Sequence, residues 1–383
     1  MKKQNPDRTG HQDIDKSRRQ LLSAAGKGLA GAALGGLAGT ATADTRKGAS
    51  RVIRWGFVGT GSIANSMANV LKTAPSATLT AVSSRRMESA QAFADSFGVG
   101  KAFDSWEEMA AWDGIDAIYV ATPTSVREEI SVAAANNGKH VLAEKPFASL
   151  PSVRRITAVC RANDVAFMDG THFVHHPRTA SIRSRMTDQV GDPWSVDSAF
   201  QFDLPDKSNI RYNPSLEPMG AIGDAGWYNM RAAVEYLSPD ASLQTANAFL
   251  RRDEETGAAV GGSGVLVFAD GETSTWNCGF DSGAVIMDLR VSGPVGSINI
   301  DDFLSQDRDN SAQYLYRKGG WGPGAVKESV RIDSALSGAA LMFEDFAAAV
   351  ADPALREQWI RATERTQTLL DAAWQSALDN EGN

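Results

Sequence analysis

Three side chains from two parts of the chain have the chemistry needed to move a hydride and a proton. Lys145 stands in Glu144-Lys145-Pro146, directly after the apolar run HVLA. A lysine at the carboxyl end of a parallel strand lies where ligands bind in doubly wound folds, and its ammonium favours the alkoxide that forms as hydride leaves. We therefore interpret Lys145 as catalytic; the alternative is a surface lysine at a turn.

Asp224 and Tyr228 lie four residues apart in GAIGDAGWYNMR, so they share one face if this segment is helical. Tyr228 is the candidate proton acceptor, because a nearby ammonium such as that of Lys145 would lower the pKa of a phenol. Asp224 would orient the substrate by accepting hydrogen bonds from its hydroxyl groups. The alternative is a core tyrosine beside a buried aspartate that caps a helix.

The segment RVIRWGFVGTGSIA predicts a strand, a glycine turn and the start of a helix. Gly59 permits the tight turn, Gly61 lets the backbone approach a pyrophosphate, and Ala64 lets the helix pack closely on the strand. The helix N-terminus at Ser62 and Ile63 then faces the phosphates. This pattern predicts a dinucleotide site.

The next strand, ATLTAVSS, ends where an NAD enzyme usually places a carboxylate on the ribose hydroxyls. Ser84 and Arg85 follow there instead. A carboxylate would repel a 2′-phosphate, whereas a hydroxyl and a guanidinium can bind it. The sequence therefore favours NADP(H) over NAD(H), with a solvated turn cation as the alternative for Arg85.

Helical and strand patterns alternate up to HVLAEKP, which predicts a parallel sheet wound by helices. After residue 190, long alternating runs indicate strands joined by turns. Two closing segments, SGAALMFEDFAAAVA and LREQWIRATERTQTLLDAAWQSAL, are typical of helices that return over the structure.

With GFVGTGSIA, VATPTSVREEISVAAANNGKHVLAEKPFA and GDAGWYNMR in this order, residues 51 to about 380 resemble the Gfo/Idh/MocA oxidoreductase family. Within it, the chain is similar in kind to glucose-fructose oxidoreductase and to dimeric dihydrodiol and sugar dehydrogenases. The resemblance implies an α/β fold: a Rossmann doubly wound parallel sheet, then an α+β domain with a large open, mostly antiparallel sheet. The strand runs after residue 190 agree with this, and the family's open sheet implies a homo-oligomer.

We expect three parts along the chain. Residues 1–43 would be a signal peptide, residues 51–172 an NADP-binding Rossmann domain, and residues 173–383 a domain for substrate binding and oligomerisation, with C-terminal helices that return over the structure.

The resemblance also implies roles for individual residues. In the family the lysine of Glu-Lys-Pro is catalytic, and an aspartate is followed four residues later by His or Tyr, as at Asp224 and Tyr228 here. Nucleotide contacts are implied at the ends of two strands, by Thr122, Pro123, Glu144 and Lys145. Many members continue after the proline with Asn-x-x-His, whereas this chain departs from the pattern with Thr124-Ser125-Val126-Arg127.

Three of the five histidines, His172, His175 and His176, lie in GTHFVHHPR. His172 and His176 would share a face only in a helix, Pro177 follows at once, and no carboxylate is spaced to complete a site, so we expect no metal. The resemblance places this segment at the substrate cleft, which makes His172 and His176 candidates for substrate contact, with polar loop packing as the alternative. The segment NIRYNPSLEPMG would form a substrate loop, in which Arg211 is the candidate to bind polar or acidic groups.

Composition points to a small-molecule partner. The net charge of −8 comes without a long basic or acidic run, which argues against a nucleic acid or an anionic membrane surface as the main partner. The two cysteines, Cys160 and Cys278, are too few for a disulfide framework and are interpreted as buried thiols.

The N-terminal residues resemble an export signal. A polar start, the pair Arg18-Arg19, a glycine-rich apolar segment and the Ala41-Thr42-Ala43 cleavage pattern follow in the order of a twin-arginine leader. This predicts a cleaved leader and a periplasmic or other extracytoplasmic location, reached in the folded state. A membrane anchor, a Sec-type leader with a chance arginine pair, or a disordered tail are the alternatives.

NADP(H) is not freely available outside the cytoplasmic membrane. We therefore expect the nucleotide to bind before export and to stay bound, reduced by one sugar-like substrate and reoxidised by another, as the resemblance implies. The alternatives are a dehydrogenase of a sugar, polyol or trans-dihydrodiol that exchanges NADP freely, a glycoside oxidation that begins an elimination, and a non-catalytic nucleotide-binding protein of the same fold.

Overall fold

The computed structural model describes residues 52–237 and 242–381. The expected leader at residues 1–43, with its cleavage site, lies outside these described residues. None of the helices within them is both long enough and apolar enough to cross a membrane.

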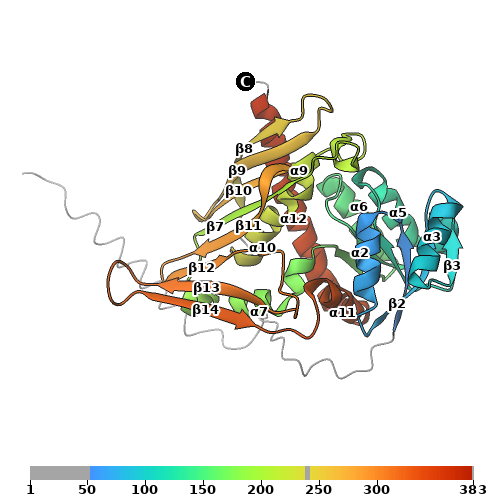
Figure 1. Ribbon diagram of the computed structural model, residues 1–383, viewed down its shortest axis with the longest axis horizontal. Helices are drawn as coiled ribbons and strands as arrows, with labels where there is room; N and C mark the ends of the chain where they lie inside the picture. Colours follow the sequence, from blue (N-terminus) through green and yellow to red (C-terminus); the bar gives the residue numbers. More distant parts are fainter. Residues whose placement is uncertain (1–51, 238–241, 382–383) are drawn as a thin grey trace, which may run out of the picture. The chain divides into compact units, whose positions relative to one another are not determined.

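The first half of the described chain builds a parallel sheet (Figure 1). Its strands lie in the order β3-β2-β1-β4-β5-β6. They are β1 (Ile53–Val58), β2 (Ala77–Ser83), β3 (Lys101–Phe103), β4 (Ala117–Val120), β5 (His140–Ala143) and β6 (Phe167–Asp169). The order reverses at β1, which pairs with both β2 and β4, and ligands bind at such a switch point in open parallel sheets. The expected Rossmann sheet is confirmed.

Helices cover both faces of this sheet, which explains why its strands are nearly continuous apolar runs. Trp55 and Phe57 point into the core on one face, and Val58 and Ile118 into the core on the other. The first core is closed by α2 (Ser62–Leu71), α3 (Met87–Phe97) and α11 (Gly338–Ala351). The second core is closed by α4 (Trp106–Ala111), α5 (Thr124–Asn136) and α6 (Leu150–Ala162).

The second sheet has eight strands in the order β14-β13-β12-β11-β7-β10-β9-β8. They are β7 (Ser195–Asp203), β8 (Leu243–Arg252), β9 (Ala259–Phe268), β10 (Thr273–Gly279), β11 (Asp281–Ser292), β12 (Gly296–Ile300), β13 (Ala312–Lys318) and β14 (Val326–Ile332). Neighbours are antiparallel except β7 and β10, which are parallel. The expected large, mostly antiparallel sheet is confirmed.

One face of this second sheet packs against α9 (Gly220–Asp224), α10 (Gly226–Tyr236) and α12 (Pro353–Glu381). Alternation along the strands puts Val196 and Trp276 on that buried face. The other face carries polar side chains as well as the exposed Phe249, and there the Gln201 amide donates to Asn277 Oδ1 at 2.6 Å. The strand pattern is that of a sheet with one covered and one open face.

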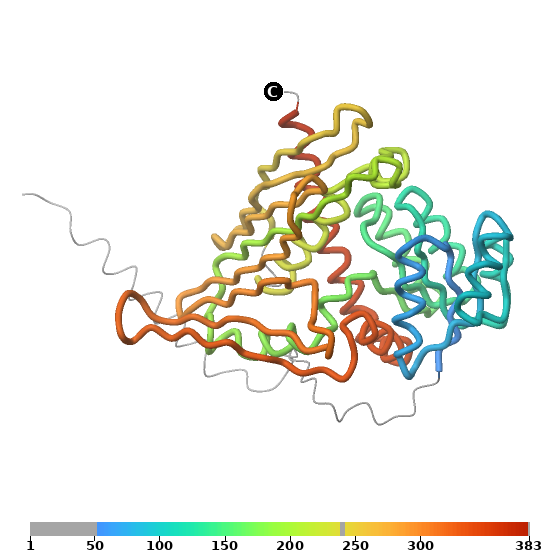
Figure 2. Tube along the Cα trace, in the orientation of Figure 1, coloured from blue at the N-terminus to red at the C-terminus, as the bar shows by residue number. Residues whose placement is uncertain are grey.

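The C-terminal helices pack against the first half. Figure 2 shows the red trace of α12 passing between the two halves, where it contacts β6 and α6 as well as β8 and α10. At β6, the buried Asp169 accepts hydrogen bonds from Thr363 Oγ1 of α12 at 2.5 Å and from Arg231 Nη2 of α10 at 3.1 Å. The nucleotide-binding sheet is therefore completed by residues from much later in the chain.

Short segments connect these elements. They are the 3-10 turns η2 (His172–His175) and η3 (Ile210–Tyr212) and the helices α7 (Pro177–Ser184) and α8 (Met186–Gln189). The domain boundary predicted at residue 172 falls just after β6. Cys160 and Cys278 are buried and unpaired, and burial raises the pKa of each thiol to about 12.

Candidate active site

Lys145 follows β5 at the carboxyl edge of the first sheet and is 8% exposed. Its Nζ lies 2.5 Å from Asp224 Oδ1 and donates a second hydrogen bond to the Asp224 carbonyl oxygen at 3.0 Å. Asp224 is the last residue of α9, beneath the second sheet. The structure therefore brings together two residues that sequence analysis selected from opposite halves.

Arg211 of η3 completes the ion cluster around Asp224. Its Nε lies 2.7 Å from Asp224 Oδ2 and its Nη2 lies 3.3 Å from Oδ1. Burial alone would raise the pKa of the Asp224 carboxyl, but Lys145 and Arg211 together hold that pKa below its ordinary value. Arg211, which we expected to contact substrate, is paired here with Asp224.

Tyr228 joins this cluster through its ring. Lys145 Nζ lies 4.7 Å from the ring centroid, which is a cation–π geometry. Asp224 and Tyr228 belong to two short helices rather than one, yet the intervening Ala225 keeps helical angles of φ −80° and ψ −40°, so the four-residue spacing still aligns them.

The pKa expected for Tyr228 is wrong in direction. Burial raises the pKa of the phenol well above its ordinary value, and the carboxylates of Glu144 and Asp224 raise it further. In this state Tyr228 carries its proton. Its ring packs against His172 and Phe200 as well as the Lys145 ammonium.

His172 is the histidine that the structure brings to the cluster. Its ring centroid lies 5.7 Å from that of Tyr228. Burial lowers the pKa of His172 to about 4, and the positive charge of Lys145 contributes to the shift. A neutral imidazole therefore faces the catalytic candidates.

The other two histidines are committed to the fold. His175 Nδ1 lies 2.8 Å from Asp345 Oδ2, and its ring packs on Trp359. His176 caps α7 by accepting from the Arg178 backbone N–H, and its Nε2 lies 2.8 Å from the Asn310 carbonyl oxygen. Both ring nitrogens of His176 are thus occupied, and the structure does not bring it to the cluster as expected. Nowhere in residues 52–237 and 242–381 do three or more potential metal ligands gather.

Glu144 has a partner that sequence reasoning missed. Tyr119 of β4 donates its hydroxyl hydrogen to Glu144 Oε1 at 2.5 Å, and both side chains are buried. Burial raises the pKa of Glu144, with Lys145 acting in the opposite direction. Space around this carboxylate is tight, because a Cβ on Gly170 would lie 2.8 Å from Glu144 Oε1. Tyr119 lies in a buried apolar strand, which gave no signal of such a role.

The glycine turn after β1 fits a dinucleotide. Gly59 has φ +108°, and a Cβ there would lie 2.7 Å from the Ala121 carbonyl oxygen, so the turn requires glycine. Gly61 has ordinary angles of φ −74° and ψ −176°, and a Cβ there would meet no atom within 4 Å. Because no contact within the described part of the chain requires glycine at position 61, the open space beside the start of α2 matches the approach of a pyrophosphate. Ser62 and Ile63 begin this helix and are exposed.

Further groups fit the rest of a dinucleotide. The Thr122 hydroxyl, in the loop after β4, is buried without a hydrogen-bond partner in the described part of the chain. After the ends of β1 and β2, Thr60 Oγ1 donates to Ser84 Oγ at 3.4 Å, next to the exposed Arg85. Ser84 and Arg85 directly follow β2 at the carboxyl edge of the sheet, and their contact with a 2′-phosphate stays a prediction.

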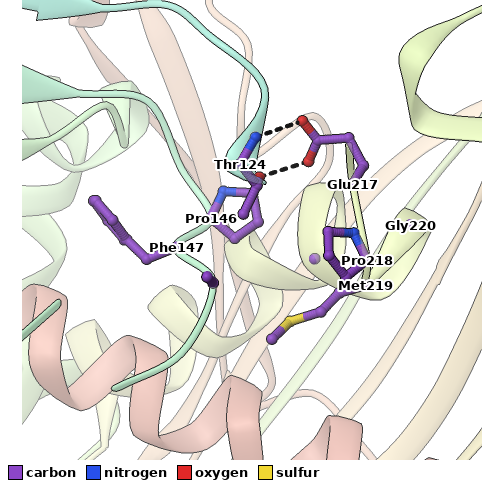
Figure 3. A pocket seen from close by; sticks show the side chains of 9 residues that line it. Thr124, Pro146, Phe147, Glu217, Pro218, Met219 and Gly220 are labelled. Carbon is purple, nitrogen blue, oxygen red and sulfur yellow. Dashed lines mark hydrogen bonds between the residues drawn. The ribbon is translucent and has the colours of Figure 1, made fainter. Parts of the chain in front are cut away.

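Sequence reasoning also missed a contact between the two halves. Figure 3 shows the Glu217 carboxylate pointing at Thr124, the first residue of α5. It accepts from the Thr124 backbone N–H at 3.0 Å and from the Thr124 hydroxyl at 2.6 Å. Pro123 precedes this helix and provides no side-chain cap for it. The nucleotide contact expected for Pro123 stays a prediction. The only sequence signal was the departure from the family pattern at residues 124–127.

The strand order, the glycine turn and the open space beside α2 define a dinucleotide-binding Rossmann fold. The family model described as "Oxidoreductase family, NAD-binding Rossmann fold" (Gfo/Idh/MocA) matches residues 53–171. A dTDP-3,4-didehydro-2,6-dideoxy-alpha-D-glucose 3-reductase of Actinomadura kijaniata is 32% identical over 232 residues, which cover 60% of this chain and 69% of that protein. The chain belongs to the Gfo/Idh/MocA family and is an oxidoreductase.

Other similar proteins extend the comparison. A D-xylose 1-dehydrogenase (NADP(+)) of Haloferax volcanii is 30% identical over 243 residues, 63% of this chain and 73% of that protein. The crystal structure of a 3-ketoreductase from Actinomadura kijaniata with NADP and TDP-benzene matches with a TM-score of 0.76 at 26% identity, covering 85% of this chain and 97% of the other. An aldose-aldose oxidoreductase from Caulobacter crescentus shares the fold, with a TM-score of 0.74 at 20% identity over 87% of this chain and 99% of the other.

Proposed function

We propose that this protein transfers hydride between NADP(H) and the CH–OH carbon of a sugar, a polyol or a related substrate. The observation that carries the proposal is the position of Lys145 Nζ between the Asp224 carboxylate and the Tyr228 ring, at the nucleotide edge of the first sheet. The names of two relatives, a sugar 3-reductase and an NADP-dependent xylose dehydrogenase, support the substrate class and the cofactor.

The nucleotide, when bound, supplies or accepts the hydride, and the chain's own residues manage the proton. In the reductive direction, the Tyr228 hydroxyl donates its proton to the carbonyl oxygen as the carbon receives hydride. The Lys145 ammonium stabilises the negative charge that develops on the same oxygen. Tyr228 carries the proton that this step requires, and the oxidative direction runs the same steps in reverse.

Asp224 has a supporting role in this scheme. Its carboxylate holds the Lys145 ammonium in place and balances the charge of both Lys145 and Arg211. When a substrate enters, its hydroxyl groups compete with these two cations for the carboxylate oxygens. Asp224 thus links the orientation of the substrate to the position of Lys145.

Replacing Lys145 tests the proposal directly. Lys145→Met should reduce hydride transfer by about 10³-fold or more, while NADP(H) binding, followed by nucleotide fluorescence, stays largely intact. Tyr228→Phe should lower kcat by about 10² to 10⁴-fold, because only the proton donor is lost. Lys72→Met, at an exposed helix end, serves as the control. Unchanged turnover in Lys145→Met would exclude this mechanism and favour a non-catalytic nucleotide-binding protein.

The nucleotide is proposed to remain bound between turnovers. Support comes from the export signal expected at residues 1–43, because a pocket filled before export needs no external NADP. Denaturing the purified mature protein should release about one equivalent of nucleotide, and turnover with two sugar substrates should need no added NADP. A protein that is purified empty and requires NADP in every assay would instead be a freely exchanging dehydrogenase.

Export in the folded state and assembly of copies through the open face of the second sheet complete the proposal. Replacing Arg18-Arg19 by two lysines should keep the precursor in the cytoplasm, as cell fractionation would show, whereas a Sec-type leader would tolerate the change. Light scattering on the mature protein should give at least a dimer, and a monomer at micromolar concentration would contradict the assembly.

A further inference from the structure

Arg127 of α5 is a buried cation to which no carboxylate of the described residues bonds directly. It is 4% exposed, and its Nη1 donates to the Pro146 carbonyl oxygen and, at 3.1 Å, to Thr124 Oγ1. Its Nη2 donates to the Thr122 carbonyl oxygen at 2.5 Å. Burying a guanidinium costs free energy unless several good hydrogen bonds replace its water, so its position calls for a function.

The two carbonyl groups belong to the two loops that build the site. Thr122 lies in the loop after β4, where the nucleotide is expected, and Pro146 directly follows Lys145 after β5. The planar guanidinium can bind two acceptors at once in a fixed geometry, which a lysine cannot reproduce. Arg127 therefore sets the distance between the nucleotide loop and the loop that carries Lys145.

Glu217 adds the substrate loop to this arrangement. Its carboxylate caps the N-terminus of α5 through Thr124, as Figure 3 shows, and the Ser125 N–H donates to the Leu216 carbonyl oxygen at 3.2 Å. A carboxylate is favourable at a helix N-terminus, and Pro123 offers no cap of its own. The loop that contains Arg211 is thereby attached to the same helix turn as Arg127.

Charge supports the same arrangement. Burial lowers the pKa of Arg127, and the carboxylates of Glu217 and Glu144 oppose that shift. Glu217 accepts a hydrogen bond from Thr124, which also accepts one from Arg127, and Glu144 directly precedes Lys145. The charge of the buried cation is thus balanced by one acid of the loop that carries Lys145 and one acid of the substrate loop.

We propose that Arg127 is a positioning residue for Lys145, and that Glu217 fixes the substrate loop to the same helix turn through Thr124. The inference rests on the catalytic role proposed for Lys145. Arg127 touches neither substrate nor the reacting atoms in this scheme; it acts through the carbonyl groups of Pro146 and Thr122.

Arg127→Met and Arg127→Lys form the main test. Arg127→Met should lower kcat, measured per bound nucleotide, by about tenfold or more, with less than a threefold change in substrate KM. Arg127→Lys should recover part of kcat, because it keeps the charge and can reach one carbonyl. Arg155→Met is the matched control, since Arg155 is an exposed arginine of the adjacent α6 that pairs with Glu128 of α5. A merely structural role would reduce the amount of folded protein and leave kcat per bound nucleotide unchanged in every variant, which would overturn the inference.

Glu217→Gln keeps the test valid if Arg127→Met does not fold. The glutamine has the same size but lacks the negative charge and the second acceptor oxygen with which Glu217 binds the two Thr124 groups. Substrate KM should rise about three- to tenfold with a smaller effect on kcat, and the exposed Glu254→Gln should behave as the unmodified protein. Unchanged KM in Glu217→Gln would contradict the role given to the substrate loop.

The outcomes separate this inference from the proposed function. Full turnover in Arg127→Met together with lost turnover in Lys145→Met overturns the inference and leaves the proposed function standing. Full turnover in Lys145→Met overturns the proposed function, and Arg127 then has no catalytic group to position.

Discussion

Lys145 and Asp224 are 79 residues apart in the sequence and 2.5 Å apart at their nearest charged atoms. One follows a strand of the parallel sheet, and the other ends a helix beneath the antiparallel sheet. Their ion pair therefore joins the nucleotide-binding half to the substrate-binding half at the point where the reaction is proposed to occur. Loss of either partner should affect both stability and turnover.

Asp224→Asn should show this double effect. Removing the carboxylate leaves the cations of Lys145 and Arg211 partly buried without compensation, so the free energy of unfolding should fall by about 3 kcal/mol. The double variant Asp224→Asn with Lys145→Met should lose less free energy of unfolding than the two single variants lose together. Urea titrations would show this. Asp281→Asn, in the exposed pair with Arg251, should cost less than about 1 kcal/mol. Strict additivity in the double variant would show that the pair carries no coupling.

Gly59 and Gly61 should respond differently to alanine. Gly59→Ala forces a left-handed φ and a clash with the Ala121 carbonyl oxygen, so the free energy of unfolding should fall by about 1 to 3 kcal/mol. Gly61→Ala meets open space at ordinary angles and should change stability by less than about 1 kcal/mol, but its methyl group should weaken NADP binding by about tenfold or more. Calorimetry on both variants checks this, and tight NADP binding by Gly61→Ala would exclude a pyrophosphate at this turn.

The choice between NADP and NAD should depend on Ser84 and Arg85. Arg85→Gln should weaken NADP binding by about tenfold, because a charge-assisted hydrogen bond to the 2′-phosphate is lost, and should leave NAD binding nearly unchanged. Ser84→Asp should reverse the preference, since its carboxylate repels the phosphate and accepts from the ribose hydroxyls. The ratio of dissociation constants measures both effects, with the neighbouring Arg86→Gln as control. If Arg85→Gln weakens the binding of NADP and of NAD by the same factor, this assignment is contradicted.

His172 should make stability depend on pH. Its folded-state pKa of about 4 lies below the ordinary 6.5, so the unfolded chain binds the proton more readily between these values. The free energy of unfolding should therefore fall as the pH drops from 6.5 toward 4, by up to about 3 kcal/mol from this group. Other acids titrate in the same range. The quantity to follow is therefore the difference in the free energy of unfolding between the unmodified protein and His172→Gln. A difference that stays constant from pH 7 to pH 4.5 would show that the imidazole is not held neutral.

Much of the fold could be predicted from the sequence because its signals are local. The glycine turn at residues 59–64 and the alternation of apolar strands with helices specify the parallel sheet, and the period-two runs after residue 190 specify the second sheet. Lys145, Asp224 and Tyr228 could be selected because each stands in a short motif, and the structure brings them into contact.

The remaining contacts could not be predicted because they join side chains across loops that have no periodicity. Arg211 was expected to face substrate, but its partner Asp224 is set by how η3 lies over α9. The high pKa of Tyr228 depends on burial and on two carboxylates, neither of which spacing reveals. In the sequence, His176 cannot be told apart from His172 as a candidate for substrate contact. The ring of His176 serves as a helix cap because α7 begins directly after it.

The hydrogen bond from Thr363 to Asp169 has a consequence for how the protein is made. The carboxylate at the end of β6 depends on a partner 194 residues further on, so the nucleotide-binding half is not a module that can finish folding while the second half is still being synthesised. Contacts of such long sequence separation slow the search for the native state. We expect a refolding reaction in which both halves acquire protection from hydrogen exchange together, late and in one cooperative step.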